Sequence, residues 1–426
     1  MTSLVLLTAA ATFRMLTLQQ ALQLALERHP DLAQAQAQAQ AAAARADQAR
    51  APLLPQLSGN ASYQRTTGNF ALRPGVVPGD LRGAGGNSLA TFNFFNFGLS
   101  ASQLVWDFRQ TSDRWQAARA NAQAAALATR TTRQQLSLAL RAAFFAARAQ
   151  RALVQVAREQ LTNQQRHLRQ VEGFVEVGTR PPIDRAQARS EVAQARLQLI
   201  EAENAYAVAK AQLKQAMGLE DERDFEVADE TLPPVGGEER ALAELLDEAL
   251  GRRPELAGLE QERRSAELSG RAARGRYWPA LTVSTSLTDA GTQLDALAWN
   301  WNAQAGVSWP LYEGGLVPAQ RREAQASVAA LSAQRTALRQ QVRVALEQAR
   351  LGVRAAKASL EAAREALEFA QQRLGLAEGR YETGAGSILE LGDAQVALTQ
   401  AASQVVQADH ALALARAQLL QALGRE

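Results

Sequence analysis

Three histidines are the side chains in this sequence best suited to acid–base chemistry or metal binding, and they lie far apart. His29, His167 and His410 occupy separate parts of the chain, and the last two fall inside long stretches of helical composition. The sequence contains no Cys and no HExxH, GxSxG or phosphate-loop pattern. Hydrolytic, nucleophilic and nucleotide-binding sites need such residues at fixed spacings. We therefore expect no enzyme activity, no cofactor and no metal site.

Acidic and hydroxyl side chains gather at two glycine-containing turns, each of which interrupts a long alanine-rich segment. Gly178 and Gly384 can adopt the positive φ that ends a helix. Asp184, Ser387 and Glu390 follow where an N-cap or first-turn oxygen would satisfy the free amides of the next helix. We expect helix capping to be the main role of Asp184.

Long helices must hold these turns. The chain has 426 residues, of which 47% are hydrophobic but only 5% aromatic. Residues 105–217 and 312–424 consist mainly of Ala, Gln, Arg, Glu and Leu, which is typical of long helices. Apolar residues recur at seven-residue spacing, which keeps one narrow stripe facing a partner helix, as in coiled coils. At a rise of about 1.5 Å per residue, the segment 106–172 forms a rod of roughly 100 Å. The series include Leu140, Ala147 and Val154 in the first segment and Leu346, Val353 and Leu360 in the second.

The chain carries an internal tandem repeat. Residues 27–33 match residues 251–257 in an Arg-X-Pro-acidic-Leu-Ala pattern, and the glycines of the two turns also fall at matching places. Shared low complexity would not align Pro and Gly, so we infer a duplication. The predicted divisions are a degraded secretory signal or N-terminal tail at 1–16, a first repeat at 17–218, an acidic linker or small equatorial element at 219–240 and a second repeat at 241–426.

Each repeat contains two predicted strands that alternate apolar with polar residues. Within 299–311 every odd position is apolar, and such a period of two gives a sheet one apolar and one polar face. Phe94 and Phe95 break the alternation, which predicts a β-bulge there. Alternation alone fits a soluble sheet slightly better than a membrane barrel. The predicted strands are 56–65, 92–105, 279–288 and 299–311, with a Gly/Pro-rich loop at 66–90 and helical hairpin tips at 173–183 and 379–389.

The context of the strands favours the membrane barrel. Their polar faces hold few charges, each strand pair adjoins a very long helix, and strands of about ten residues suit a membrane span. Four strands leave two open edges, whose amides would be unsatisfied in lipid. Closure therefore needs further copies, and three chains would give about twelve strands around a water-filled bore. The predicted lipid-facing or interfacial residues are Trp106, Trp299, Trp301, Val307, Trp309 and Tyr312.

The duplication and the two turns resemble the TolC-type outer-membrane efflux channel family over nearly the whole chain. The segment 380–395 has the family's Arg-Tyr pair, a Gly three residues after the Tyr, then Ser and an acidic-Leu pair before Ala-Gln. The segment 173–184 resembles the partner turn. The resemblance implies a mainly α fold with β: a trimeric 12-stranded transmembrane β-barrel in the outer membrane, continuous with a long coiled-coil α-barrel in the periplasm. It also implies an exit channel of a tripartite efflux or type I secretion system, fed by a periplasmic adaptor protein and an inner-membrane pump.

The resemblance assigns roles to residues at the turns. It places Glu390 and Asp393 on the inner wall of the periplasmic constriction, where three copies would form acidic rings. Tyr381 and Asp184 match positions that tie neighbouring helices together in the closed state. Gly386 departs from the pattern, because some members carry there an Arg that helps to latch the mouth. The residues implied to form the tip turns and the adaptor docking surface are Gly178, Thr179, Arg180, Gly384, Gly386 and Ser387.

A periplasmic coiled-coil adaptor or structural scaffold is the alternative interpretation. Adaptors have one hairpin flanked by unlike domains, whereas this chain has two equivalent hairpins with equivalent strand pairs. Nucleic-acid binding has little support, because the formal net charge is only +3 and no basic block occurs. The sequence therefore favours the channel.

Overall fold

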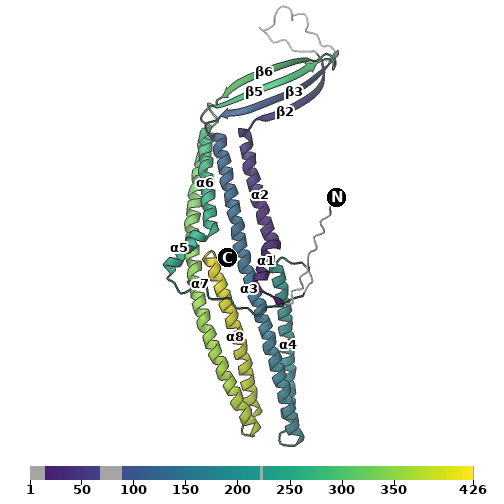
Figure 1. Ribbon diagram of the computed structural model, residues 1–426, viewed down its shortest axis with the longest axis vertical. Helices are drawn as coiled ribbons and strands as arrows, with labels where there is room; N and C mark the ends of the chain where they lie inside the picture. The colour runs from purple at the N-terminus through teal and green to yellow at the C-terminus, as the bar shows by residue number, and fades with distance from the viewer. Residues whose placement is uncertain (1–14, 68–88, 221–223, 426) are drawn as a thin grey trace, which may run out of the picture. The chain divides into compact units, whose positions relative to one another are not determined.

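The computed structural model describes residues 15–67, 89–220 and 224–425 (Figure 1). Residues 1–14 of the predicted tail and most of the predicted Gly/Pro-rich loop lie outside the described residues. The helices are α1 Leu18–Arg28, α2 Pro30–Arg50, α3 Gln110–Glu176, α4 Pro182–Ala216, α5 Leu242–Arg252, α6 Pro254–Gly275, α7 Leu316–Glu382 and α8 Ile388–Ala422, with a 3₁₀ helix at Ala51–Leu53. The strands are β1 Met15–Leu16, β2 Gln56–Thr67, β3 Thr91–Trp106, β4 Glu226–Val227, β5 Ala280–Gly291 and β6 Ala298–Ser308.

The chain divides into two compact units. The helical unit takes its described residues from 1–38, 125–258 and 334–426, and the sheet unit from 39–124 and 259–333. Each unit therefore contains residues from both predicted repeats, so the units do not coincide with the repeats. The predicted linker at 219–240 lies within the helical unit.

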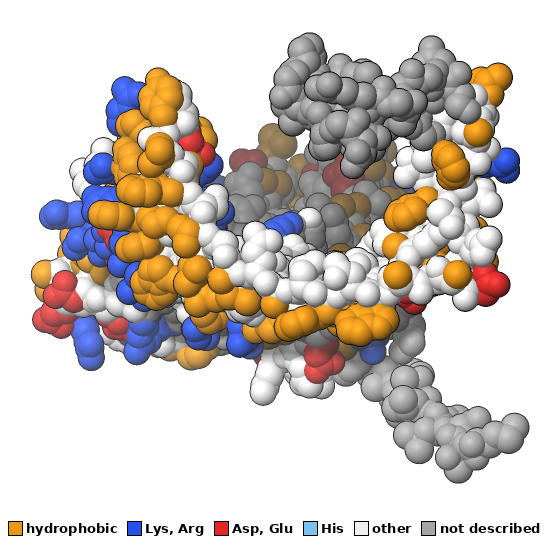
Figure 2. All heavy atoms as spheres, turned by 90° about the horizontal axis from the view of Figure 1, so that it is seen from above, with side chains coloured by type: hydrophobic (Ala, Val, Ile, Leu, Met, Phe, Trp, Pro, Cys, Tyr) orange, Lys and Arg blue, Asp and Glu red, His pale blue; other side chains and the backbone are white. Residues whose placement is uncertain are grey.

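The sheet unit contains four antiparallel strands in the order β2-β3-β5-β6. Partners across strands lie on the same face of a sheet. The register places Leu99, Leu287 and Trp301 in one row, and Ser100 with Ser286 in the next row on the opposite face. Figure 2 shows hydrophobic side chains along one side of the curved sheet and other side chains along its inner side. The alternation in the sequence thus becomes an apolar face and a polar face.

The irregularity of β3 does not lie at the predicted place. Phe94 and Phe95 both pair regularly with β2. Phe94 lies on the polar face, so it interrupts the alternation of the sequence but not the hydrogen-bonded pairing of the strands. The register shifts instead between Leu104 and Trp106, beside the end of the strand. A bulge at this point turns Trp106 back toward the apolar face, where it pairs with Leu281.

Strand β6 is shorter than the predicted segment 299–311. It ends at Ser308, because Pro310 has no N–H to donate to a ladder. Trp309 consequently lies just after the strand, where its Nε1 donates to the carbonyl oxygen of Tyr277 at 3.0 Å.

Two helical hairpins dominate the helical unit: α3 with α4, and α7 with α8. Helices α3 and α7 have 67 residues each, and α4 and α8 have 35 each. The seven-residue stripes are confirmed, since all six residues named for them are at most 6% exposed. Two apolar clusters form around these stripes, one holding Leu140 and Ala147 and the other Leu346 and Val353. No helix in the described ranges is long and apolar enough to cross a membrane.

The end of the predicted tail belongs to the fold. Met15–Leu16 pairs in parallel with Glu226–Val227, and Leu16 is 2% exposed within the cluster around Leu140. Thr17 then caps α1 by a reciprocal pair of hydrogen bonds with Gln20. Met15 and Leu16 of the predicted tail thus pack as part of the helical unit, because an apolar residue directly before a capped helix is anchored by burial.

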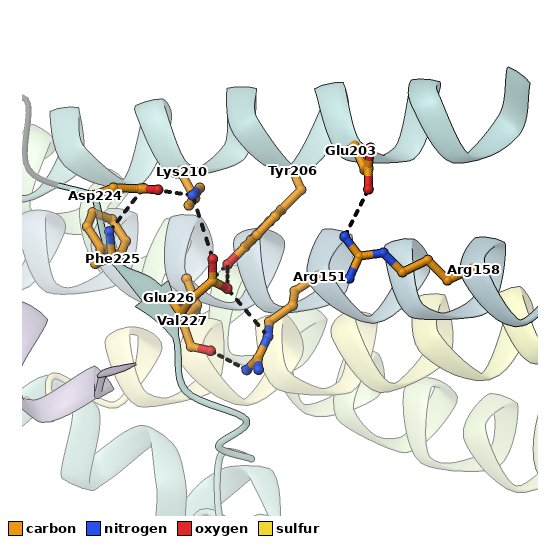
Figure 3. A network of polar contacts seen from close by, with 9 residues as sticks. All are labelled: Arg151, Arg158, Glu203, Tyr206, Lys210, Asp224, Phe225, Glu226 and Val227. Carbon is orange, nitrogen blue, oxygen red and sulfur yellow. Dashed lines mark hydrogen bonds and ion pairs between the residues drawn. The ribbon is translucent and has the colours of Figure 1, made fainter. Parts of the chain in front are cut away.

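Polar contacts fasten the predicted acidic linker to the first hairpin (Figure 3). Lys210 lies 2.7 Å from Asp224, and Arg151 donates to the carbonyl oxygen of Val227 at 2.6 Å. The hydroxyl of Tyr206 donates to Glu226 at 2.8 Å. Burial, together with this bond, raises the pKa of Tyr206 to about 12. The linker is thus held by side chains of both α3 and α4.

Candidate functional site

The tip of the first hairpin is a short turn closed by its own backbone. Gly178 has a φ of 80°, and the N–H and hydroxyl of Thr179 both donate to the carbonyl oxygen of Phe174 at 2.9 Å. The N-cap of α4 is Pro181, which provides no side-chain bond. Asp184 is therefore not the N-cap residue; it lies in the first turn, 8% exposed, where the helix dipole favours a negative charge.

The tip of the second hairpin is capped as predicted. Gly384 has a φ of 80°, and Ser387 is the N-cap of α8, its Oγ accepting from the N–H of Glu390 at 3.1 Å. The Glu390 side chain is 41% exposed and pairs with Arg380 at 3.3 Å. Asp393 is exposed one turn further along α8.

Gly386 lies where the backbone of the turn closely approaches the end of α7. Its N–H donates to the carbonyl oxygen of Arg380 at 2.8 Å. A Cβ at this position would lie 3.1 Å from atoms of Arg380 and from the backbone nitrogen of Tyr381. A side chain at position 386, such as Arg, would therefore make tight contacts with Arg380 and Tyr381 that the turn relieves only by shifting a few tenths of an ångström.

Tyr381 joins the two tips. It is 2% exposed, with its ring centroid 5.3 Å from that of His167 and 6.3 Å from that of Phe174. The guanidinium of Arg180 lies over the ring at 4.7 Å and donates to the Tyr381 carbonyl oxygen at 3.4 Å. Asp184, which the resemblance paired with Tyr381, is buried at the tip of the first hairpin. One aromatic ring of the second hairpin is thus enclosed by side chains of the first.

Buried polar residues lie between the hairpins, and nothing in the sequence predicted their burial. Gln164 donates to Gln395 at 2.9 Å in a buried contact, and His167 is 4% exposed. Both Gln164 and His167 lie inside α3, where a polar residue is ordinarily assigned to the solvent side. Burial lowers the pKa of His167, while the charges of Glu191 and Asp184 oppose that shift.

Acidification is expected to loosen the contact between the tips. Because the pKa of His167 is depressed in the fold, its contribution to stability is present above the ordinary value of about 6.5 and is lost as pH falls through the lower, folded value. His167→Gln should remove this dependence. Hydrogen exchange of the tip segments across acid pH measures it, and equal acid sensitivity in both proteins would contradict the assignment.

The predicted interfacial residues of the sheet unit share one exposed face. By register, Trp106, Trp299, Trp301 and Val307 all lie on the apolar face. Trp299 is 74%, Trp301 62% and Val307 69% exposed. The indole Nε1 of Trp301 donates to Thr285 at 2.9 Å, so the one polar atom of that ring is paired within the face. Tyr312, beyond the strand, is 88% exposed.

An aromatic cluster that the sequence did not reveal lies where the strands join the helices. Phe108 packs on Trp106 with centroids 5.9 Å apart and on Trp278 at 5.2 Å. Phe108 and Arg109 have φ values of 51° and 68°, which non-glycine residues rarely adopt. This strained turn between β3 and α3 holds the Phe108 ring beside the apolar face.

Comparison with known proteins assigns the family. A model of the outer membrane efflux protein family matches residues 21–219 and 245–425. The chain belongs to this family. The pyoverdine export outer membrane protein OpmQ of Pseudomonas aeruginosa is 28% identical over 308 residues, which are 71% of this chain but only 63% of OpmQ. The crystal structure of CusC covers 97% of this chain and 94% of CusC, with a TM-score of 0.82 and 22% identity. That of VceC from Vibrio cholerae covers 96% of both chains, with a TM-score of 0.81 and 20% identity.

Membership of the outer membrane efflux protein family confirms the predicted resemblance, the outer-membrane location and the predicted class of function. The solved structures confirm the mainly helical fold with some β-sheet. The family consists of efflux proteins, which supports transport rather than catalysis. Among the residues that the structure describes, no group of three or more His, Asp or Glu is placed to hold a metal ion.

Proposed function

We propose that three copies of the chain form one exit duct through the outer membrane for an efflux or type I secretion system. The sheets close into a 12-stranded β-barrel, and the hairpins form an α-barrel in the periplasm. The observation that carries the proposal is the sheet. One face is exposed and mainly apolar, with its charged residues Arg65 and Asp289 toward the strand ends remote from the helices, and the other face is polar and uncharged. Among the described strands β2 and β6 each pair on one side only, and closure with further copies satisfies both edges.

The proposal includes the tandem duplication. Support comes from the equal lengths of α3 and α7, and of α4 and α8, and from a family match in two separate segments. If each chain contains two copies of one hairpin-and-strand unit, a trimer contains six similar units. The two hairpin tips of each chain would then alternate around the mouth of the channel.

The hairpin tips are proposed to meet a periplasmic adaptor protein, which connects the duct to an inner-membrane pump. Their turns are short and closed by internal hydrogen bonds, so they offer a fixed surface. Ile183 is 72% and Leu389 69% exposed beside the turns, which suits burial against a partner. Glu390, Asp393, Tyr381 and Asp184 are proposed to form the constriction.

Removing the acidic groups is expected to lower cation selectivity. Three copies of Glu390 and Asp393 would concentrate cations at the mouth, so Glu390→Gln and Asp393→Asn should shift the reversal potential in a salt gradient toward zero. Glu361→Gln is the matched control, because it removes an exposed carboxylate about 30 Å back along α7. Unchanged reversal potentials in bilayer recordings would contradict the acidic rings.

The duct itself is tested by extraction and conductance. We expect the chain to need detergent, to run as a heat-sensitive trimer on a gel and to form steady single channels in a planar bilayer. A chain that fractionates without detergent would overturn the duct and favour the alternative, a periplasmic coiled-coil adaptor or scaffold.

A further inference from the structure

We propose that a groove between α6 and α7, beside the sheet, binds the headgroup of an anionic phospholipid of the inner leaflet. The proposal rests on the membrane barrel proposed above and adds a lipid site to it. The groove has a volume of about 250 Å³, and three arginines border it: Arg271, Arg274 and Arg321.

These arginines are free of charge partners within the fold. Arg271 and Arg274 are exposed and Arg321 is half-buried, and none of them forms an ion pair with another described residue. The one carboxylate bordering the groove, Glu267, pairs with Arg263 at 2.5 Å. The groove therefore presents three unneutralised guanidinium groups, which suit a phosphate diester.

The floor of the groove is apolar and shallow. Gly270 brings the two helices close together, since a Cβ there would lie 3.1 Å from the Cβ of Ala324. Ala266 and Val328 continue the floor, whereas Gln325 and Glu267 offer polar atoms. A headgroup with hydroxyls, such as phosphoglycerol, finds both kinds of surface there.

The level of the arginines along the helices matches that of lipid headgroups. Arg271 lies four residues before the end of α6, and Arg321 five residues after the start of α7. Arg271 is thus about 6 Å from the end of α6 and Arg321 about 8 Å from the start of α7, and short connections lead from these helix ends to β5 and β6. The headgroup layer on each side of a bilayer is about 5–8 Å thick. A membrane around the sheet would thus place phosphates beside these side chains.

The turn that follows α6 places Trp278 of the aromatic cluster on the same side of the helix as Arg271 of the groove. Backbone bonds from Tyr277 to Arg274 and from Trp278 to Gly275 continue the turn of α6 beyond its last residue. This brings Trp278 round to the side of Arg271, and Trp278 packs on Phe108. Exposed aromatic rings are typical of membrane interfaces. Acyl chains leaving the groove would pass Trp278 and reach the apolar face of the sheet.

The opposite side of the same two helices has a different character. A second groove there is lined by alanines together with Arg114, Glu323, Gln320 and serines, so it holds one cation beside a carboxylate-bearing residue. Of these two grooves, the one bordered by Arg271, Arg274 and Arg321 has three cations without an ion pair among the described residues, whereas the other has one arginine and Glu323.

The test is lipid binding by the full-length trimer in detergent. Native mass spectrometry is expected to detect retained phosphatidylglycerol in preference to phosphatidylcholine. Replacing the three arginines by Gln should weaken phosphatidylglycerol binding more than about tenfold, and each single replacement about fivefold. A control variant with Arg45→Gln, Arg119→Gln and Arg264→Gln removes three exposed arginines of the same unit outside the groove and should change binding less than about twofold.

Three outcomes would overturn the lipid site. These are equal binding of the two lipids, equal weakening by both triple variants, and displacement of the lipid by millimolar inorganic phosphate. If the triple variant does not assemble, the single variants decide. Conductance and heat-sensitive assembly report separately on the duct: a variant that conducts normally but loses phosphatidylglycerol supports the site. A chain that needs no detergent would overturn the duct and the site together.

Discussion

Replacing Tyr381 by Ala is expected to separate the two hairpin tips and to raise single-channel conductance. Tyr381 is 2% exposed and contacts His167, Phe174 and Arg180. Removing a buried aromatic ring costs about 3 to 5 kcal/mol when the surrounding residues cannot collapse into the space. That amount would move a closed mouth to a mostly open one, since about 5.5 kcal/mol separates populations of 1:99 and 99:1. Bilayer recordings measure the conductance, and hydrogen exchange measures the loosened tips.

Tyr381→Phe is the matched control. The Tyr381 hydroxyl is buried and has no hydrogen-bond partner among the described residues. The Phe variant keeps the ring and removes only that group, so it should leave conductance and tip protection close to those of the native chain. If the Phe variant opened the channel as far as the Ala variant, the hydroxyl rather than the packing would hold the tips.

Placing Arg on the apolar face of the sheet is expected to abolish assembly in the membrane. Ala303 lies on that face, near the middle of β6 and opposite Thr285. A charge at this depth costs about 2 to 4 kcal/mol per strand in a lipid-facing position. Three copies would multiply the loss, so Ala303→Arg should leave almost no heat-sensitive trimer. Val307→Arg, closer to the helices, should cost less.

Asn302→Arg is the control for this prediction. Asn302 neighbours Ala303 in the chain and lies on the polar face, opposite Ser286. In a water-filled bore an Arg at this position keeps its hydration, so trimer yield should stay near the native level while conductance changes. Equal loss of trimer in both variants would refute the assignment of the two faces.

The periodic parts of the fold were predictable because their physical cause repeats along the chain. A seven-residue spacing such as Leu140, Ala147 and Val154 recurs often enough to define a buried stripe. The period of two in residues 299–311 likewise indicated the apolar face, although Pro310 shortened the strand. Periodicity carries information about faces, and it carries less about where an element ends.

The polar contacts of the candidate site could not be predicted in the same way. His167 and Gln164 occupy ordinary helical positions, and only the packing of the second hairpin against the first buries them. The cap formed by Ser387 could be predicted from the sequence, because its hydrogen bond joins Ser387 to Glu390, only three residues further along the chain. Phe108 meets Trp278 only because two residues adopt positive φ, which no residue type at those positions indicates.

The unpaired outer sides of β2 and β6 also have a genetic consequence. In a closed trimer each chain pairs through β2 with one neighbour and through β6 with the other. A single chain with a damaged edge strand therefore leaves the barrel open for all three chains. If intact and edge-damaged chains were produced in equal amounts and mixed at random, about one trimer in eight would contain only intact chains. Edge mutations in this protein should therefore behave as dominant-negative alleles when they are expressed together with the intact gene.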